Sequence, residues 1–252
     1  MNIWQALILG SLQGVTEFLP VSSSGHLALA QNWFGLTEPL VAFDVFLHVM
    51  SLIAIVIFFF AEIKKLNLKQ LIMLGVATIP AVIVGLVFKD VLESIFSLTT
   101  LVGLALITTG IDNLISNKLL KNSYQEKEIT LKNAVIIGIF QSVALIPGIS
   151  RSGTTLLGSL SQKLEKKQAF NFTFLLAIPA ITGATLLQTL DLFTGQTEIP
   201  ALPLLVAGGL ATLVTSLASL GIMKKLIKEA QFLPFGIYAI GLGLFVVLQA
   251  LI

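Results

Sequence analysis

The chain has 252 residues, of which 56% are hydrophobic and only 11% are charged. Soluble domains carry about 25% charged residues, so this composition excludes an ordinary soluble domain and indicates an integral membrane protein. The formal net charge of +2 is less informative than the placement of the charges, and the lack of cysteine excludes disulfide bonds and thiolate metal sites.

Two kinds of apolar segment follow one another along the chain. The segments at 3–30 and 132–160 are each broken by a polar centre that contains proline. A helix broken at membrane depth is tolerated only where protein or a wet cavity satisfies its backbone groups. Six other stretches have the roughly 20 apolar residues that a helix needs to cross a bilayer. We expect these spans at 42–60, 69–88, 97–115, 169–190, 201–222 and 233–251.

The positive charges indicate how these segments cross the membrane. All but two of the 15 basic residues fall in four clusters, and short loops rich in lysine stay cytoplasmic. Six spans and two re-entrant hairpins put all four clusters on one side, and the loops at 30–41 and 191–200, which have no lysine or arginine, on the other. We therefore predict re-entrant hairpins with both termini outside. The start of the chain lacks the basic region of a cleaved signal peptide, so we expect every apolar segment to be retained. The clusters are Lys64, Lys65 and Lys69; Lys118, Lys121, Lys127 and Lys132; Lys163, Lys166 and Lys167; and Lys224, Lys225 and Lys228.

The two halves of the chain resemble each other. Six residues of the first hairpin recur 128 residues later: Gly10, Gln13, Val15, Ser22, Ser24 and Gly25 return as Gly138, Gln141, Val143, Ser150, Ser152 and Gly153. Residues 1–116 and 132–252 then each hold one hairpin and three spans. Because three is odd, the second repeat is inverted, and the hairpin tips are expected to meet near the midplane. Inverted repeats with broken helices are also a plan of transporters, so the fold alone does not define the function.

The first polar island places Gln13 and Glu17 on one helical face, before Pro20 ends the helix. The hydroxyls of Ser22, Ser23 and Ser24 follow, and can cap the returning helix. A carboxylate with an amide or hydroxyl oxygen suits a hard divalent cation such as Mg²⁺ or Ca²⁺. The alternative is that Glu17 only forms hydrogen bonds that stabilise the break.

The second polar island runs from Pro147 to Thr155 and surrounds Arg151 with small residues. Backbone N–H groups and a helix N-terminus can bind an oxyanion there, and arginine has a geometry suited to phosphate. An unpaired arginine at membrane depth is costly, so we expect Arg151 to pair with Glu17 or with an anionic substrate. The alternative is a purely structural Arg–Glu pair between the hairpins.

The two histidines invite different interpretations. His26 follows the serine run in a hairpin and could act as acid, base or nucleophile. We interpret His48 as a satisfied polar residue. Asp44 and Asp112 lie near the ends of their spans and are interpreted as interfacial or helix-contact residues, with Asp44 as the one that could border the site.

These motifs resemble the undecaprenyl pyrophosphate phosphatase family of BacA-type bacitracin-resistance proteins. The stretch from Gln13 to His26 is similar to the family's E/Q-G-x-T-E-F-L-P-[VI]-S-S-[ST]-G-H, and that from Pro147 to Thr155 to P-G-x-S-R-S-G-x-T. A third stretch, 174–184, also resembles a family segment. The resemblance covers essentially the whole chain. One departure is Gln13, which stands where many members have glutamate and weakens the case for a metal ligand there.

The resemblance implies hydrolysis of the terminal phosphate of a C55 polyprenyl diphosphate at the outer face of the bacterial plasma membrane. It implies metal or acid–base roles for Glu17 and Gln13, and a nucleophile that is either Ser23 or His26. Its expected partners are the lipid substrate and the bilayer, with no nucleic acid, and a homodimer is left open. The residues expected to hold the diphosphate are Arg151, Ser150, Ser152 and Thr155, together with the hydroxyls of Ser22 and Ser24.

Two other functions remain open on the sequence. A secondary transporter or polyprenyl-phosphate flippase could use the same inverted repeat. A structural membrane scaffold is a third interpretation, which leaves the paired polar islands unexplained.

Overall fold

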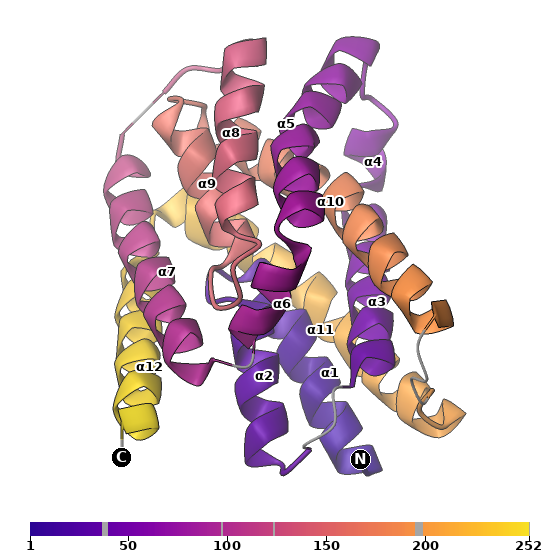
Figure 1. Cartoon of the computed structure of the whole chain (residues 1–252). Coiled ribbons are helices and arrows are strands. Elements are labelled where there is room, and N and C mark those ends of the chain that lie inside the picture. The colour runs from indigo at the N-terminus through magenta and orange to yellow at the C-terminus, as the bar shows by residue number, and fades with distance from the viewer. Residues whose placement is uncertain (37–39, 97, 123, 195–198, 252) are drawn as a thin grey trace.

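The computed structural model describes residues 1–252 except 37–39, 97, 123, 195–198 and 252 (Figure 1). Within these residues every regular element is a helix, and six helices are long and apolar enough to cross a membrane. This confirms the predicted all-helical membrane protein with six spans. The six are α3 (Val41–Phe58), α5 (Leu68–Val87), α7 (Thr99–Leu119), α10 (Lys166–Thr194), α11 (Leu202–Glu229) and α12 (Leu233–Leu251).

Each broken segment forms two shorter helices that run back on each other. The first pair is α1 (Ile3–Phe18) and α2 (Ser23–Trp33), and the second is α8 (Leu131–Val143) and α9 (Arg151–Ser161). A re-entrant path depends on where the bilayer lies, so re-entrance and the inverted repeat stay predictions. The observed arrangement is compatible with both.

The helices pair in a way that matches across the two halves. Helix α1 packs on α11 and α8 packs on α5, so the first helix of each hairpin rests on the second span of the other half. The last spans, α7 and α12, lie side by side (Figure 1). Glycine permits both hairpin contacts, because a Cβ atom at Gly10 would lie 2.2 Å from the Gly208 carbonyl oxygen and one at Gly138 would lie 2.4 Å from that of Ala77.

Two short helices were not expected from the sequence. Helix α4 (Phe60–Ile63) and helix α6 (Lys89–Phe96) extend beyond the first and second spans. Charged residues end the apolar runs at these points, which explains why hydropathy alone showed only the spans.

Aromatic side chains form the core beneath the hairpin tips. Phe59, Phe170 and Phe174 are buried and their rings are in contact, with centroids 4.9 Å apart for the last two. Phe18, the last residue of α1, meets Phe174 edge-on at 5.9 Å. Burial of these large rings fixes the end of α1 against α3 and α10, and so positions the residues that follow it.

Candidate active site

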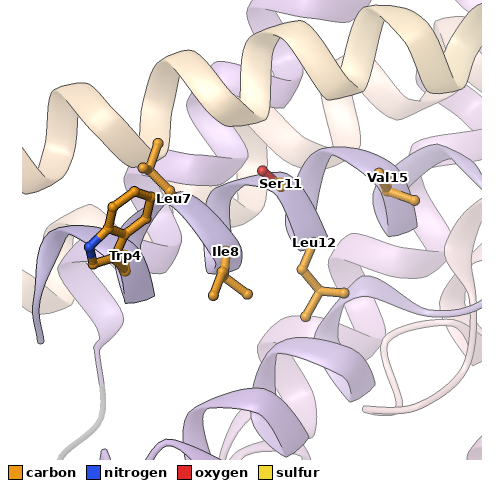
Figure 2. Close-up of a pocket in the computed structure, with 6 residues that line it drawn as sticks. All are labelled: Trp4, Leu7, Ile8, Ser11, Leu12 and Val15. Carbon is orange, nitrogen blue, oxygen red and sulfur yellow. The ribbon is translucent and has the colours of Figure 1, made fainter.

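A shallow apolar groove of about 490 Å³ follows the outer side of α1, but it is not the polar site (Figure 2). Its lining comes from α1 alone: Trp4, Leu7, Ile8, Ser11, Leu12 and Val15. Gln13 and Glu17 are buried on another face of the same helix. The groove is therefore part of the apolar outer surface, and the candidate site lies inside the protein.

The two hairpin tips touch directly, as the matched polar islands predicted. The Ser152 hydroxyl donates to the Leu19 carbonyl at 3.2 Å, and the Gly148 N–H donates to the Ser24 hydroxyl at 3.4 Å. A Cβ atom on Gly153 would lie 3.2 Å from the Pro20 ring. The small residues of the second island thus let the two backbones approach closely.

Side chains of helix α7 form hydrogen bonds with both hairpin tips. The Asn113 amide donates to the Pro20 carbonyl at 2.6 Å in the first hairpin. The Thr109 hydroxyl donates to the Gly148 carbonyl at 2.9 Å and accepts from the Ser150 N–H at 2.9 Å in the second. Both side chains are buried. Since buried polar groups bonded in this way resist separation, the tips hold a defined relative position.

The turn of each hairpin ends in a capped helix N-terminus. Ser22 has a φ of 72° and its hydroxyl accepts from the Gly25 N–H, in the first turn of α2. Ser150 does the same for Gly153, in the first turn of α9. Two helix N-termini with their partial positive charges therefore begin at the junction, an arrangement suited to an anionic group.

Glu17 lies at the centre of the junction, and its carboxylate has three hydrogen-bond donors. The Arg151 guanidinium of the second hairpin donates to Oε1. The Ser23 hydroxyl donates to Oε2 at 2.5 Å, and the Gln13 amide donates to the same atom at 3.2 Å. Of the two partners expected for Arg151, Glu17 or an anionic substrate, the structure shows Glu17, and the i, i+4 placement of Gln13 is as expected.

Two buried polar atoms beside this carboxylate lack a hydrogen-bond partner among the described residues. They are Nη1 of Arg151 and Oε1 of Gln13. An unsatisfied buried polar atom costs free energy, so each one calls for a partner such as a ligand, an ion or a water molecule. Here the two atoms offer a substrate one cationic donor and one carbonyl oxygen.

His48 also faces Glu17, which the sequence interpretation missed. Its Nδ1 donates to the Asp44 carbonyl at 2.8 Å, as a satisfied residue would, but its Nε2 lies 3.9 Å from Glu17 Oε2. The Asp44 carboxylate accepts from the Gln31 amide at 2.9 and 3.0 Å, which links α3 to α2. Asp44 is therefore a helix-contact residue next to the site, in agreement with one of the two interpretations.

His26 has a different set of partners. Its Nδ1 donates to the Ser22 carbonyl at 2.7 Å, and its Nε2 accepts from the Tyr238 hydroxyl at 2.8 Å. The two rings stack with centroids 5.7 Å apart. Both ring nitrogens are thus engaged within the protein, and Tyr238 of α12 could not have been assigned to this region from a sequence distance of 212 residues.

The remaining predicted substrate-binding hydroxyls bond mainly within the protein. Ser22 and Ser24 lie 3.3 Å apart, oxygen to oxygen, and Ser150 and Ser152 lie 3.2 Å apart. Thr155 is fully buried one turn after Arg151, and its hydroxyl has no partner among the described residues. Asp112 accepts from the Thr154 hydroxyl at 2.7 Å and is a helix-contact residue, as expected.

The donor set fits a divalent cation only if the substrate supplies further ligands. The described residues contain no cluster of three or more histidine, cysteine, aspartate or glutamate side chains. Glu17 contributes one carboxylate, and the unpartnered Gln13 Oε1 contributes one hard oxygen. Mg²⁺ commonly takes one or two protein ligands and completes its shell with substrate phosphates and water.

The junction combines a hydroxyl that is hydrogen-bonded to a carboxylate, a buried guanidinium and two helix N-termini. The carboxylate can take a proton from Ser23, and the guanidinium can neutralise a phosphate oxygen. Such a constellation suits attack on phosphorus in a negatively charged group, because phosphoryl transfer depends mostly on positioning and charge stabilisation.

Comparison with known proteins gives a consistent result over the whole chain. The sequence profile of the family described as Bacitracin resistance protein BacA matches residues 6–245. Undecaprenyl-diphosphatase 4 of Bacillus cereus is 38% identical over 250 residues, which cover 98% of this chain and 96% of the relative. Undecaprenyl-diphosphatase of Methanococcus maripaludis is 40% identical over 256 residues, which cover 97% and 99%. The corresponding protein of Desulforapulum autotrophicum is 35% identical over 269 residues, which cover 97% of each chain.

Proposed function

The chain belongs to the family of the Bacitracin resistance protein BacA, and we propose that it is a membrane phosphatase that hydrolyses undecaprenyl diphosphate. The products are undecaprenyl phosphate and inorganic phosphate, so the enzyme returns the lipid carrier to cell-wall synthesis. Relatives named undecaprenyl-diphosphatase support this function over a transporter or flippase. The observation that carries the proposal is the ion pair between Glu17 and Arg151, one from each hairpin.

Arg151 binds the diphosphate in this proposal. Its Nη2 is held by Glu17, and its Nη1 is buried without a partner among the described residues, so one donor fixes the side chain and the other is available. A guanidinium in a water-poor site stabilises the charge that develops on the transferred phosphoryl group. The N-termini of α2 and α9 add N–H donors on the same junction.

Ser23 is the nucleophile of the proposed reaction. Its Oγ attacks the terminal phosphorus, the bond from that phosphorus to the bridging oxygen breaks, and undecaprenyl phosphate leaves with the bonding electrons. Glu17 Oε2, which already accepts the Ser23 hydroxyl at 2.5 Å, takes its proton. Water then hydrolyses the phosphoserine, releases inorganic phosphate and restores the hydroxyl. This geometry favours Ser23 over His26, whose ring nitrogens bond to Ser22 and Tyr238.

His26 has an assisting role in the proposal. It fixes the first turn of α2 through the Ser22 carbonyl and connects it to α12 through Tyr238. The placement of Ser23, which starts α2, depends on that turn. Four serine hydroxyls of the tips act structurally in this proposal: they keep the two tips aligned around the phosphate position and are not free donors. They belong to Ser22, Ser24, Ser150 and Ser152.

A divalent cation is part of the proposed active site. Glu17 and Gln13 would hold it, with phosphate oxygens of the substrate as further ligands. When bound, it neutralises charge on the diphosphate. The support is the unpartnered Gln13 oxygen beside the carboxylate.

The protein is a multi-pass membrane protein, and we place its site on the outer side of the plasma membrane. The lysine clusters support this orientation, with both termini outside. Because the chain has no cysteine, single cysteines report topology cleanly. An impermeant thiol reagent applied outside intact cells is expected to label Asn32→Cys and to spare Gln125→Cys; the reverse pattern would overturn the orientation.

The decisive experiment measures phosphate release from undecaprenyl diphosphate by the purified protein in detergent, with and without a chelator. We expect one phosphate released per lipid and loss of activity with the chelator. A companion assay follows lipid movement across vesicle membranes. Lipid movement without any phosphate release would replace the enzyme by the transporter or flippase.

A further inference from the structure

Two hydrogen-bond acceptors face each other beside the candidate active site. His48 donates from Nδ1 to the Asp44 carbonyl, so Nδ1 carries a hydrogen and Nε2 is the ring nitrogen that can offer a lone pair. That lone pair lies 3.9 Å from Glu17 Oε2, which is too long for a direct hydrogen bond. Two acceptors at this separation are stabilised by a positive centre between them.

The gap has the size of one coordinated metal ion. Bonds of roughly 2.1 Å to a common ion hold two ligand atoms between about 3 and about 4.2 Å apart, depending on the angle between them. The Nε2 to Oε2 distance falls within this range. Arg151 is bonded to Oε1, so an ion at Oε2 would share that atom with the Ser23 hydroxyl and take the place of the Gln13 amide N–H.

His48 has the bonding pattern of a metal ligand. Metal-bound histidines characteristically donate their second ring nitrogen to a carbonyl or carboxylate, which fixes the tautomer and the ring direction. Here the Asp44 carbonyl accepts that bond at 2.8 Å, and the Asp44 carboxylate is fixed in turn by Gln31 of α2. The hydrogen bond from Nδ1 thus fixes the orientation of the imidazole ring, and Nε2 faces the Glu17 carboxylate.

A third ligand atom is next to the pair. Gln13 Oε1 is buried without a partner among the described residues, while its Nε2 bonds to Glu17 Oε2 and to the Ser51 hydroxyl. A half-turn of the amide exchanges the two atoms and presents the oxygen to a cation. The set is then one imidazole nitrogen, one carboxylate oxygen and one amide oxygen.

We propose that His48 Nε2 is a ligand of the divalent cation in this site and that it selects a transition metal such as Mn²⁺ over Ca²⁺. Ca²⁺ takes oxygen ligands, whereas imidazole suits first-row transition metals. The inference rests on the cation of the proposed function and changes its chemical class from the Mg²⁺ or Ca²⁺ expected from sequence. His26 has no such role, because both of its nitrogens are bonded within the protein.

The test is electron paramagnetic resonance of Mn²⁺ titrated into the purified full-length protein. We expect one bound Mn²⁺ with a nitrogen hyperfine coupling, and biosynthetic [¹⁵N]histidine is expected to convert this coupling to that of ¹⁵N without any mutation. His48→Gln should abolish the coupling and weaken Mn²⁺ binding by at least about tenfold, with Ca²⁺ binding changed little. His26→Gln is the matched control and should retain the coupling.

Several outcomes would overturn the assignment. They are failure to bind Mn²⁺, bound Mn²⁺ with no nitrogen coupling, or a coupling that survives His48→Gln. Phosphate release by the same samples separates this proposal from the function. Phosphate release without a nitrogen-coupled metal would support the phosphatase function and contradict the role of His48 as a ligand. A nitrogen-coupled metal without phosphate release would support the metal site and contradict the phosphatase function.

Discussion

The two hairpins share a backbone plan but differ in the chemistry of equivalent positions. Each ends in a serine that caps the return helix, Ser22 for α2 and Ser150 for α9. The next residue, 128 positions apart in the two halves, is Ser23 in the first hairpin and Arg151 in the second. The same position of the repeat thus supplies the proposed nucleophilic hydroxyl in the first half and the proposed phosphate-binding cation in the second half. The acid that bonds to both, Glu17, belongs to the first hairpin alone.

The difference teaches how a repeated scaffold makes an asymmetric site. Caps, glycine contacts and hydroxyl pairs are kept in both hairpins because they hold each turn together. At this site the two hairpins supply groups of opposite charge, Glu17 from the first and Arg151 from the second. The following experiments test whether equivalent residues of the two hairpins have the same structural roles but different chemical roles.

The largest expected effect is the loss of Arg151. Arg151→Ala removes the cation and leaves Glu17 as a buried carboxylate without its charge partner, so kcat/KM for phosphate release should fall by about 10²–10³-fold or more. Lys225→Ala is the matched control, because Lys225 is an exposed cation far from the hairpin tips in the chain, and its activity should equal that of the wild type. An Arg151→Ala variant with near-wild-type kcat/KM would reduce the ion pair to a structural contact.

A serine from each hairpin separates catalysis from structure. Ser23→Ala should lower kcat by about 10²-fold or more, because the nucleophile is lost, with a small change in thermal stability. Ser152→Ala should instead weaken the contact to Leu19 and lower the free energy of unfolding by about 1 kcal/mol, with activity kept within a few-fold. Phosphate release and thermal unfolding in detergent measure both. Equal activity losses for the two serines would contradict the division.

The glycine contacts should be interchangeable between the halves. Gly10→Ala and Gly138→Ala each force a Cβ atom into a facing carbonyl, and overpacking of this kind costs about 1–3 kcal/mol. Gly75→Ala is the control, because a Cβ atom there meets no atom within 4 Å and alanine favours a helix interior. The melting temperature should drop for the first two variants only. A loss confined to one hairpin would show that the two contacts are not equivalent.

The smallest expected effect concerns the caps. Ser22 has a φ of 72°, which glycine adopts without the strain of a side chain, whereas Ser150 has a φ of −75°. Ser22→Gly should therefore leave the melting temperature unchanged or raise it slightly. Ser150→Gly should lower the melting temperature slightly, because the free energy of unfolding falls by only about a few tenths of a kcal/mol. The opposite order of melting temperatures would contradict the assigned backbone strain.

The sequence predicted the spans and the central ion pair for simple physical reasons. Apolar length reports a membrane span, and the cost of a charge in an apolar environment marks Glu17 and Arg151 as partners. It did not predict which neighbours complete the site. His48 lies on an apolar span with no local signal for the direction of its ring, and Tyr238 reaches His26 from the last helix. Such contacts depend on the rotation and packing of distant helices, which hydropathy does not encode.

A double-mutant cycle between Glu17 and Arg151 tests most directly whether the two hairpins build one composite site. Phosphate release is measured for Glu17→Gln, Arg151→Met and the double variant. Residues that act as a unit have strongly non-additive effects, so the double variant should be about as impaired as the worse single variant. Losses that multiply would show that the two residues act independently, and would contradict a site built jointly by the two hairpins.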